Sequence, residues 1–283
     1  MSVDKGVLYV VATPLGNLGD MSTRAVEVLS GVDVIAAEDT RHSLPLLRHF
    51  GVKVPCIAYH EHNERERCIE LAGRLQAGES VALISDAGTP LVSDPGYHLV
   101  RLARERGIRV APVPGPSALI AALSVSGLPT DRFVFEGFLS ARPAARRQRL
   151  EDLSGDGRTL VFFESSHRIL DSLEDMAQVL GGDREAVVAR ELTKLYETIH
   201  GDTLAGLCQW LHADANQRKG EFVVMVHGAA PRGEEALDAE AERVLRVLLE
   251  ELPVKQAAAL AAKITGQKKN FLYRAAVEMV GSE

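Results

Sequence analysis

Short apolar segments alternate with amphipathic stretches in the first half of the chain, and this alternation restricts the possible folds more than any other feature. The apolar segments are rich in β-branched residues, which favours buried strands at residues 7–11, 32–37, 81–84 and 110–113. The stretches between them have the spacing of helices, at residues 22–29, 40–50, 63–76 and 97–106. Nearly continuous apolar strands joined by helices indicate a parallel sheet that is covered on both faces.

The pattern changes after the proline-rich segment 112–116, which is too stiff to be helical. A helix is expected at 117–126. Strands are then expected at 133–135, 159–163, 186–189 and 222–226, separated by helical stretches at 146–153, 169–180 and 204–211. This second pattern predicts another α/β domain, with a mixed sheet.

Residues 229–233 have the composition of a linker, and the chain beyond them is entirely helical in pattern. Helices are expected at 240–251, 253–264 and 270–280. The last two, around Gly266, are interpreted either as a helix-turn-helix or as a small packing appendage. The predicted domains are therefore 1–114 and 115–230, both α/β, and 234–283, which is helical.

The composition excludes several classes of protein. The 283 residues include 32 basic and 39 acidic side chains, a net charge of −7, which argues against an overall coat of nucleic acid but allows a local basic patch. Three scattered cysteines without a CxxC pair argue against a disulfide scaffold or a zinc site, and no metal is expected. The apolar run 7–12 is too short for a signal peptide or a membrane span, so we expect a cytoplasmic protein that does not contact membranes.

Three turn-rich loops follow predicted strands, at residues 13–20, 85–96 and 112–117. Ligands bind beyond the carboxyl ends of the strands in an open parallel sheet. Glycine allows a close approach of the backbone, and small side chains leave space for a flat group such as adenine. The three loops together predict a ligand cleft. They contain neither a GxGxxG dinucleotide fingerprint nor a P-loop.

Charged groups lie in two other patterns. The segments 38–41 and 190–194 each follow a predicted strand, where their charges either line the cleft or form structural ion pairs. Two basic clusters contrast with the acidic balance of the chain, and each is interpreted either as a phosphate contact or as a solvated helix face. Their members are Arg142, Arg146, Arg147 and Arg149 in one, and Lys263, Lys268, Lys269 and Arg274 in the other.

Taken together, these motifs resemble the bacterial 16S rRNA (cytidine 2′-O) methyltransferases, which have the tetrapyrrole-methylase-like fold of S-adenosylmethionine-dependent methyltransferases. The resemblance rests on seven motifs that occur in order, at residues 11–20, 37–41, 59–64, 84–90, 112–118, 190–194 and 219–221. Tetrapyrrole methylases carry a GxGPGD loop near the start, and segment 13–17 departs from it, which argues against a porphyrinoid substrate. Diphthine synthase is another relative of this fold.

The resemblance implies two α/β domains with a cofactor cleft between them, a small C-terminal helical domain and a homodimer. The implied reaction is S-adenosylmethionine-dependent 2′-O-methylation of a cytidine in the decoding region of 16S rRNA, within the small ribosomal subunit. Two alternatives stay open. One is another methyltransferase of this fold, similar to diphthine synthase or to a tetrapyrrole methylase. The other is a ribosome assembly factor without catalytic activity.

The same motifs supply the candidate site residues. The cofactor-binding candidates are Pro14, Leu15, Gly16, Asp86, Ala87, Gly88, Ser117 and Ala118. The catalytic candidates, a base or a cation near the reacting hydroxyl, are Glu191, Lys194, Glu38 and Asp39. The RNA-binding candidates are Arg41, Arg142, Arg146, Arg147, Arg149, Lys268 and Lys269.

Overall fold

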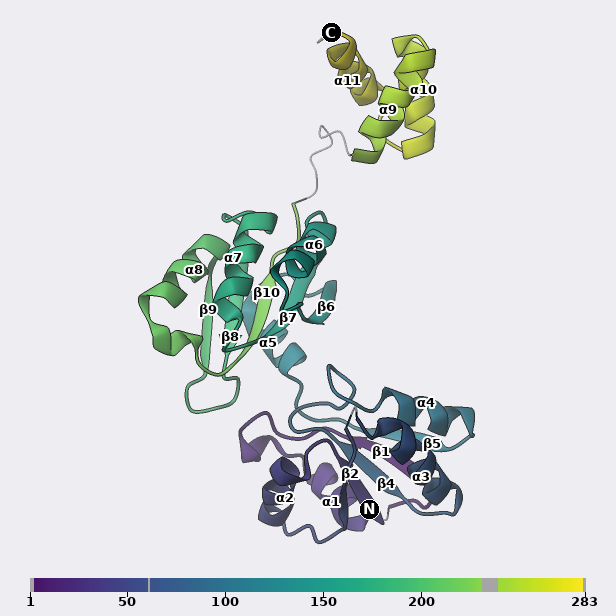
Figure 1. Ribbon diagram of the computed structural model, residues 1–283, viewed down its shortest axis with the longest axis vertical. Helices are drawn as coiled ribbons and strands as arrows, with labels where there is room; N and C mark the ends of the chain where they lie inside the picture. The colour runs from purple at the N-terminus through teal and green to yellow at the C-terminus, as the bar shows by residue number, and fades with distance from the viewer. Residues whose placement is uncertain (1–2, 61, 231–238, 282–283) are drawn as a thin grey trace. The chain divides into compact units, whose positions relative to one another are not determined.

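The computed structural model describes residues 3–60, 62–230 and 239–281. The chain divides into two compact units, Met1–Gly228 and Ala229–Glu283. The first unit contains two five-stranded sheets with their own helices (Figure 1). Both predicted α/β domains fall within this unit, and the boundary at residue 114 stays a prediction.

The first sheet is parallel throughout, as the sequence predicted, with strand order β3-β2-β4-β1-β5. Its strands are β1 (Val7–Val11), β2 (Val34–Ala37), β3 (Cys56–Ala58), β4 (Val81–Ile84) and β5 (Arg109–Val113). Its helices are α1 (Thr23–Gly31), α2 (Thr40–His49), α3 (Glu64–Gln76) and α4 (Tyr97–Glu105), with a short 3₁₀ helix η1 (Leu18–Asp20).

Alternating side chains of the strands explain why both faces of this sheet are covered. Val7 and Val11 of β1 pack in one core with residues of α1 and α2. Leu8, which points to the opposite face, packs in a second core with residues of α3 and α4. The central strands are therefore apolar on both sides, and the polar ligand-binding groups are left to the loops at their ends.

The second sheet is mixed, which confirms the prediction, and its strand order is β6-β7-β10-β8-β9. Only β6 and β7 are parallel. The strands are β6 (Phe133–Phe138), β7 (Thr159–Ser165), β8 (Glu185–Arg190), β9 (Thr198–Thr203) and β10 (Glu221–Val226). The helices are α5 (Ala118–Ser126), α6 (Pro143–Leu153), α7 (Ile169–Leu180), α8 (Leu204–Ala213) and the 3₁₀ helix η2 (Ala215–Arg218).

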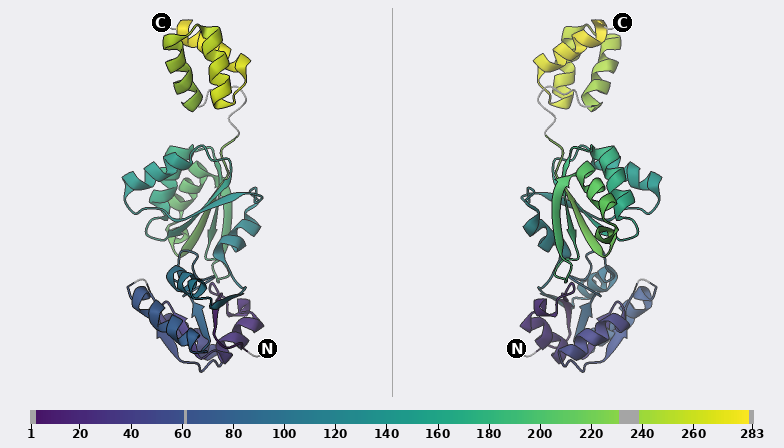
Figure 2. Two further views of the ribbon diagram at one scale, coloured as in Figure 1. Left: turned by 90° about the vertical axis from the view of Figure 1, so that its right-hand side faces the viewer. Right: turned by 90° about the vertical axis from the view of Figure 1, so that its left-hand side faces the viewer.

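The two faces of the second sheet have different roles. Phe162 and Val224 point into the larger core, which also contains residues of α6, α7 and α8. These helices lie on one side of the second sheet (Figure 2). Val161 and Val223 point to the opposite face, where α5 and Leu15 of the loop after β1 pack against them. Leu192 of the loop after β8 also packs there, and Val223 of this face lines the cavity described below.

The described part of the second unit contains three helices, α9 (Ala239–Glu251), α10 (Val254–Thr265) and α11 (Lys269–Gly281). Small residues allow close packing: Ala257, Ala258 and Ala261 of α10 are fully buried against leucines of the other two helices. Gly266 adopts a left-handed conformation and ends α10, so that α11 can fold back on it. The first residues of the predicted domain, 234–238, lie outside the described residues.

Candidate functional site

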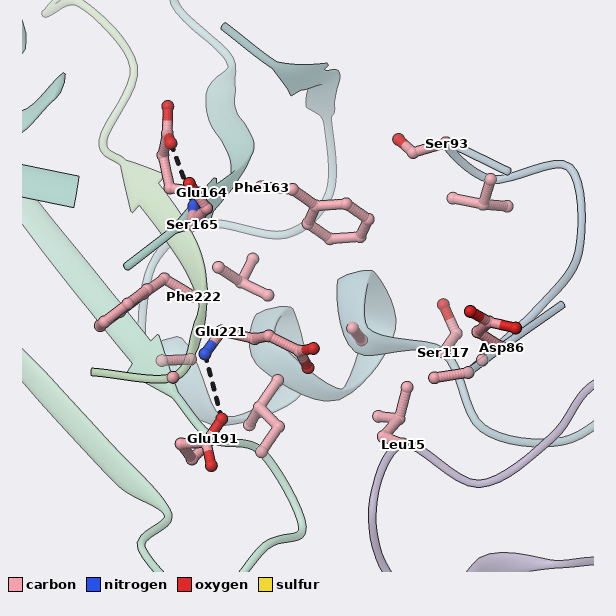
Figure 3. A pocket seen from close by; sticks show the side chains of 18 of the residues that line it. Leu15, Asp86, Ser93, Ser117, Phe163, Glu164, Ser165, Glu191, Glu221 and Phe222 are labelled. Carbon is pink, nitrogen blue, oxygen red and sulfur yellow. Dashed lines mark hydrogen bonds between the residues drawn. The ribbon is translucent and has the colours of Figure 1, made fainter. Parts of the chain in front are cut away.

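A cavity of about 700 Å³ lies in the first unit, within the size range of pockets that hold a small ligand (Figure 3). The loops after β1, β2 and β4 and the start of α5 line one side, where the residues include Leu15, Glu38, Asp86 and Ser117. The end of β7, the loop after β8 and the start of β10 form the other side, together with Phe138. The cleft predicted from three loops is therefore present, and the second sheet completes it.

Six of the eight predicted cofactor-binding residues line this cavity, namely Leu15, Asp86, Ala87, Gly88, Ser117 and Ala118. Pro14 is buried and Gly16 is exposed, and neither lines it. A methyl group on Gly16 would come within 2.5 Å of the Lys194 side chain. The structure thus gives Gly16 another role, because its missing side chain leaves room for Lys194 from the opposite side of the cavity.

Hydrogen bonds join the three loops into one wall. The N–H and C=O groups of Thr13 and Gly88 form two mutual hydrogen bonds of 2.9 Å. The Thr89 hydroxyl donates to the Pro116 carbonyl at 3.0 Å. Gly88 has a left-handed backbone (φ +79°), and an added methyl group would come 3.2 Å from Leu15. The wall is therefore a rigid surface of main chain and small side chains.

Asp86 is a charged group of this wall, and both of its carboxylate oxygens have partners within the protein. Its Oδ1 accepts a hydrogen bond from the Asp39 N–H at 3.1 Å, and its Oδ2 lies 2.9 Å from Nδ1 of His42. The hydrogen bond to Asp86 raises the pKa of His42 above its usual value. This imidazole partner could not be inferred from the sequence, because it lies 44 positions earlier in the chain.

The cavity has a strongly acidic lining. Among the lining residues, six carry carboxyl groups, Glu38, Asp86, Asp94, Glu164, Glu191 and Glu221, and Lys194 is the one basic residue. Burial raises the pKa of Asp94 to about 6, and the neighbouring charge of Asp86 acts in the same direction. Such a lining is electrostatically suited to a ligand with positive charge.

Lys194 lies between two of these carboxylates. Its Nζ is 2.9 Å from Oε1 of Glu191 and 2.8 Å from Oε2 of Glu221. Glu191 also accepts a hydrogen bond from the Glu221 N–H at 3.0 Å, which Figure 3 shows. Burial acts to lower the pKa of Lys194, but the two carboxylates outweigh it and the pKa is raised. Lys194 is therefore a fixed cation and unsuited to accept a proton.

The backbone around these charges is strained. Glu191 (φ +50°) and Thr193 (φ +64°) adopt left-handed conformations that are unfavourable for residues with side chains. Gly220 makes room for Glu191, because a methyl group at Gly220 would come 2.5 Å from its side chain. Strain of this kind concentrates at functional sites, where the surrounding structure maintains it.

The remaining catalytic candidates occupy different positions. Glu38 lines the cavity, whereas Asp39 does not. Asp39 caps the N-terminus of α2, and hydrogen bonds from the Arg41 guanidinium and N–H lower its pKa to about 2. Such an acidic carboxyl is a poor proton acceptor, so the geometry argues against Asp39 as the catalytic base.

The prediction that Arg146 contacts RNA is wrong. Its side chain is buried at 3% exposure, and its Nε donates to Asp175 at 2.6 Å. The same carboxylate accepts from Arg147 at 3.1 Å. The cluster of arginines in the sequence was misleading because the carboxylate that pairs with Arg146 lies on another helix, α7. A buried guanidinium group needs such a partner.

The other RNA-binding candidates are more accessible. Arg149 is half exposed but forms two hydrogen bonds with Glu136, and Arg41 is exposed but forms three with Asp39. Arg142 is exposed directly before α6. Lys268 and Lys269 are exposed at the start of α11.

Several cavity residues were not selected from the sequence. Asp94 lies in a loop that the sequence analysis quoted, but its burial depends on packing that the sequence does not show. Phe138, Phe163 and Glu164 lie at the ends of β6 and β7. Phe163 belongs to the predicted strand 159–163, whereas Phe138 and Glu164 lie beyond the predicted strands 133–135 and 159–163. The sequence feature that could have indicated this part of the cavity is the pair Ser165 and Ser166. These polar residues come at the end of a buried strand, as the ligand-binding loops of the first sheet do.

No helix among the described residues is long and apolar enough to cross a membrane. Comparison with known proteins gives two family matches, Tetrapyrrole (Corrin/Porphyrin) Methylases over residues 7–208 and the RsmI C-terminal HTH domain over residues 235–279.

Two curated relatives are named ribosomal RNA small subunit methyltransferase I. The protein from Pseudomonas aeruginosa is 60% identical over 98% of both chains, and that from Escherichia coli O157:H7 is 56% identical over 98% of this chain and 96% of its own. Among solved structures, cobalt precorrin-4 methyltransferase superposes with a TM-score of 0.60 at 17% identity, over 78% of this chain and 95% of that one. Diphthine synthase superposes with a TM-score of 0.58 at 17% identity, over 78% and 89%.

Proposed function

The chain belongs to the tetrapyrrole (corrin/porphyrin) methylase family, and we propose that it methylates the RNA of the small ribosomal subunit. In this proposal the methyl donor is S-adenosylmethionine, and the acceptor is the ribose 2′-hydroxyl of a cytidine in the decoding region of 16S rRNA. The observation that carries the proposal is the cavity itself, in which a wall built from small residues faces a fixed lysine.

The residues of the cavity fit the proposed donor. Bound S-adenosylmethionine supplies a methyl group on a positively charged sulfur. The adenine of the donor would lie on a small, rigid surface formed by Leu15, Ala87 and Gly88. The N–H groups of the first turn of α5, beside Ser117 and Ala118, can donate hydrogen bonds to the donor. Asp86 accepts hydrogen bonds from its ammonium or hydroxyl groups. The acidic lining complements the net positive charge of the donor.

Lys194 supports the chemistry at the acceptor. Methyl transfer forms a bond between the 2′-oxygen and carbon, breaks the carbon–sulfur bond and releases the hydroxyl proton. The ammonium group of Lys194 stabilises the negative charge that develops on the 2′-oxygen, while Glu191 and Glu221 hold this ammonium group in place. Positioning by the two sides of the cavity lowers the barrier further. Asp94, with a pKa of about 6, joins Glu38 as a candidate for the proton acceptor. Glu191 is a weaker candidate, because burial acts to raise its pKa but the hydrogen bond from Lys194 holds that pKa below the usual value.

The second unit is the proposed contact with the RNA backbone. Its helices α10 and α11 carry Lys255, Lys263, Lys269 and Arg274, and Lys268 lies in the turn between them. Glu278 is the one acidic residue between 254 and 281. This local positive charge offsets the acidic balance of the chain. Among the candidates in the first unit, we retain Arg142. The proposed setting is the cytoplasm.

A homodimer is part of the proposal. Large apolar side chains are exposed on the first unit, including Ile120 and Val125 of α5 and Leu195 of the loop after β8. Exposed apolar groups of this size are typical of protein contacts. The molecular mass in solution, measured by light scattering, tests this part.

The decisive experiment is mass mapping of 16S rRNA from cells with and without the gene. We expect one ribose methyl group, on a decoding-region cytidine, to disappear with the gene and to return when the gene is restored. Calorimetric titration of the purified protein with S-adenosylmethionine tests the donor separately. An unchanged 16S rRNA together with no donor binding would overturn the enzymatic function in favour of a non-catalytic role.

A further inference from the structure

A β-bulge at the end of β6 directs two phenylalanine rings to the same face of the second sheet. In a regular strand, Phe135 and Phe138 would point to opposite faces, because side chains alternate. The pairing of β6 with β7 shifts register between Phe135 and Gly137. As a result, both rings pack edge to face on Phe163, with centroid distances of 4.7 Å for Phe135 and 5.8 Å for Phe138.

Gly137 makes this bulge compatible with the opposite wall of the cavity. Its backbone is left-handed (φ +65°), a conformation that favours glycine. A methyl group at Gly137 would come 3.2 Å from the Ser93 hydroxyl oxygen, which belongs to the loop after β4. Ser93 is itself left-handed (φ +66°). The bulge therefore lies close to the opposite side of the cavity.

Arg168 holds the Phe138 ring from the protein side. Its guanidinium carbon lies 5.7 Å from the ring centroid, and its Nη1 donates to the Leu139 carbonyl at 2.9 Å. The charge of Arg168 is balanced by Glu164, which is fully buried and lies 3.5 Å away. Phe138 is thus fixed by its neighbours, yet it is 52% exposed and lines the cavity.

An exposed and fixed aromatic ring is suited to stack on a flat ligand. Two flat groups take part in the proposed reaction, the adenine of the donor and the base of the acceptor nucleotide. The residues assigned to the donor lie on the loops of the first sheet and at the start of α5, whereas Phe138 comes from the second sheet. The acidic lining also disfavours phosphate groups inside, so an RNA nucleotide would insert its base and ribose and leave its phosphates outside.

We propose that Phe138, supported by Phe163, is the surface on which the target base of an unstacked RNA nucleotide lies during methyl transfer. The inference rests on the proposed function. It adds that the acceptor nucleotide leaves its stack and is recognised through the face of its base, as RNA-binding proteins do with single-stranded nucleotides. Stacking on Phe138 would also place the ribose of that nucleotide beside the donor.

The test compares Phe138→Ala, Phe138→Trp and the control Phe133→Ala, whose ring is 37% exposed on the same strand and is not part of the cavity lining. Methyl transfer to small ribosomal subunits from the gene-deleted strain gives kcat/KM, and calorimetry gives the affinity for S-adenosylmethionine. For Phe138→Ala we expect kcat/KM to fall roughly 5- to 150-fold, the loss expected for one base–aromatic stack, with donor affinity unchanged. Phe138→Trp should retain activity because it retains a stacking surface.

Each other outcome has a distinct meaning. A wild-type protein that transfers no methyl group to the subunits would contradict the proposed function itself. An active wild type with an equally active Phe138→Ala variant would overturn the inference alone. A parallel loss of donor affinity in Phe138→Ala would also overturn it, because the ring would then hold the adenine of the donor.

Discussion

The two sheets of the first unit contribute to one cavity by different means. The side built by the first sheet combines main chain, glycine and small side chains with the carboxylates of Glu38, Asp86 and Asp94, and its loops are joined by the paired hydrogen bonds of Thr13 and Gly88. The side built by the second sheet consists of charged and aromatic side chains, with Lys194 between two carboxylates and Phe138 on a bulge. A surface of the first kind is suited to hold one fixed ligand closely. The second kind supplies charge and stacking to a reacting partner.

This difference suggests a division of labour, in which the first sheet binds the methyl donor and the second sheet acts on the acceptor. This division is testable. A variant on the first-sheet side should change the affinity for the donor, whereas a variant on the second-sheet side should change the reaction with the acceptor. Donor affinity, kcat and the KM for ribosomal subunits are therefore the quantities to compare.

The largest effect is expected for Lys194→Met, which removes the cation but keeps a side chain of similar length. Losing one group that stabilises developing negative charge typically lowers kcat about 10²- to 10³-fold. Donor affinity should be unchanged, since the donor-binding residues assigned above lie on the other side. Single-turnover kinetics and calorimetry measure the two quantities.

The matched control for this variant is Lys219→Met, because Lys219 is exposed and contacts only Asn216 through its ammonium group among the described residues. It should retain wild-type kcat. A Lys194→Met protein that turns over normally but binds the donor weakly would reverse the proposed division.

A smaller but still large effect is expected for Asp86→Ala, on the other side of the cavity. Removing one partner of a charged hydrogen bond weakens binding by about 30-fold or more, so the Kd for S-adenosylmethionine should rise by at least that factor. The melting temperature should change little, because the side chain is partly exposed. Unchanged donor affinity with a lowered melting temperature would instead assign Asp86 to structural support of the Asp39 N–H and His42.

The side built by the first sheet was largely predictable from the sequence because its signals are local. Strands β1 and β4 were predicted with their observed ends, and their loops contain the glycines, prolines and small residues that any close ligand contact requires. Strand β3 was missed because it has three residues, and β9 was missed because it is a polar edge strand interrupted by Gly201. Neither strand supplies residues to the cavity lining.

The other side was less predictable because its chemistry depends on partners distant in the sequence. Lys194 and Glu191 were selected by their position after a strand, but Glu221, which completes their arrangement, lies 27 residues beyond Lys194. The β6 bulge depends on pairing with β7, and a single-sequence pattern does not show it. The prediction for Arg146 failed for the same reason, since its partner Asp175 lies 29 residues further along the chain.

Asp94 tests whether the division is strict, because it belongs to the first sheet but has the raised pKa, about 6, expected of a catalytic carboxyl. A carboxyl whose pKa is higher in the folded than in the unfolded chain destabilises the fold once it is ionised. The penalty is complete above pH 6 and disappears as the pH falls toward the unfolded value near 4. Asp94→Asn should therefore stabilise the protein by about 1–2 kcal/mol at pH 8, after allowance for partial exposure, and by much less at pH 4.

Thermal unfolding of Asp94→Asn and the wild type across this pH range measures the effect, without ligand. The activity of the same variant then separates two roles. A stabilised variant with normal donor affinity and reduced kcat would support Asp94 as the proton acceptor. The first-sheet side of the cavity would then take part in catalysis as well as in donor binding. A stability difference that does not depend on pH would contradict the raised pKa.

The smallest effect is expected for the salt dependence of RNA binding, because neither side of the cavity is proposed to bind the RNA backbone. Lys269→Gln with Arg274→Gln removes two exposed charges of α11, and Arg147→Gln with Arg149→Gln removes two charges of α6 that are paired with carboxylates. Both double variants change the net charge equally.

Each lost phosphate contact should reduce the slope of log affinity against log salt by roughly 0.7–0.9. The α11 variant should therefore lower the slope by about twice that amount, and the α6 variant should leave it unchanged. Equal slopes for the two variants would show that net charge, rather than the α11 surface, governs RNA binding. A reduced slope for the α6 variant alone would return the RNA contact to the first unit, beside Arg142.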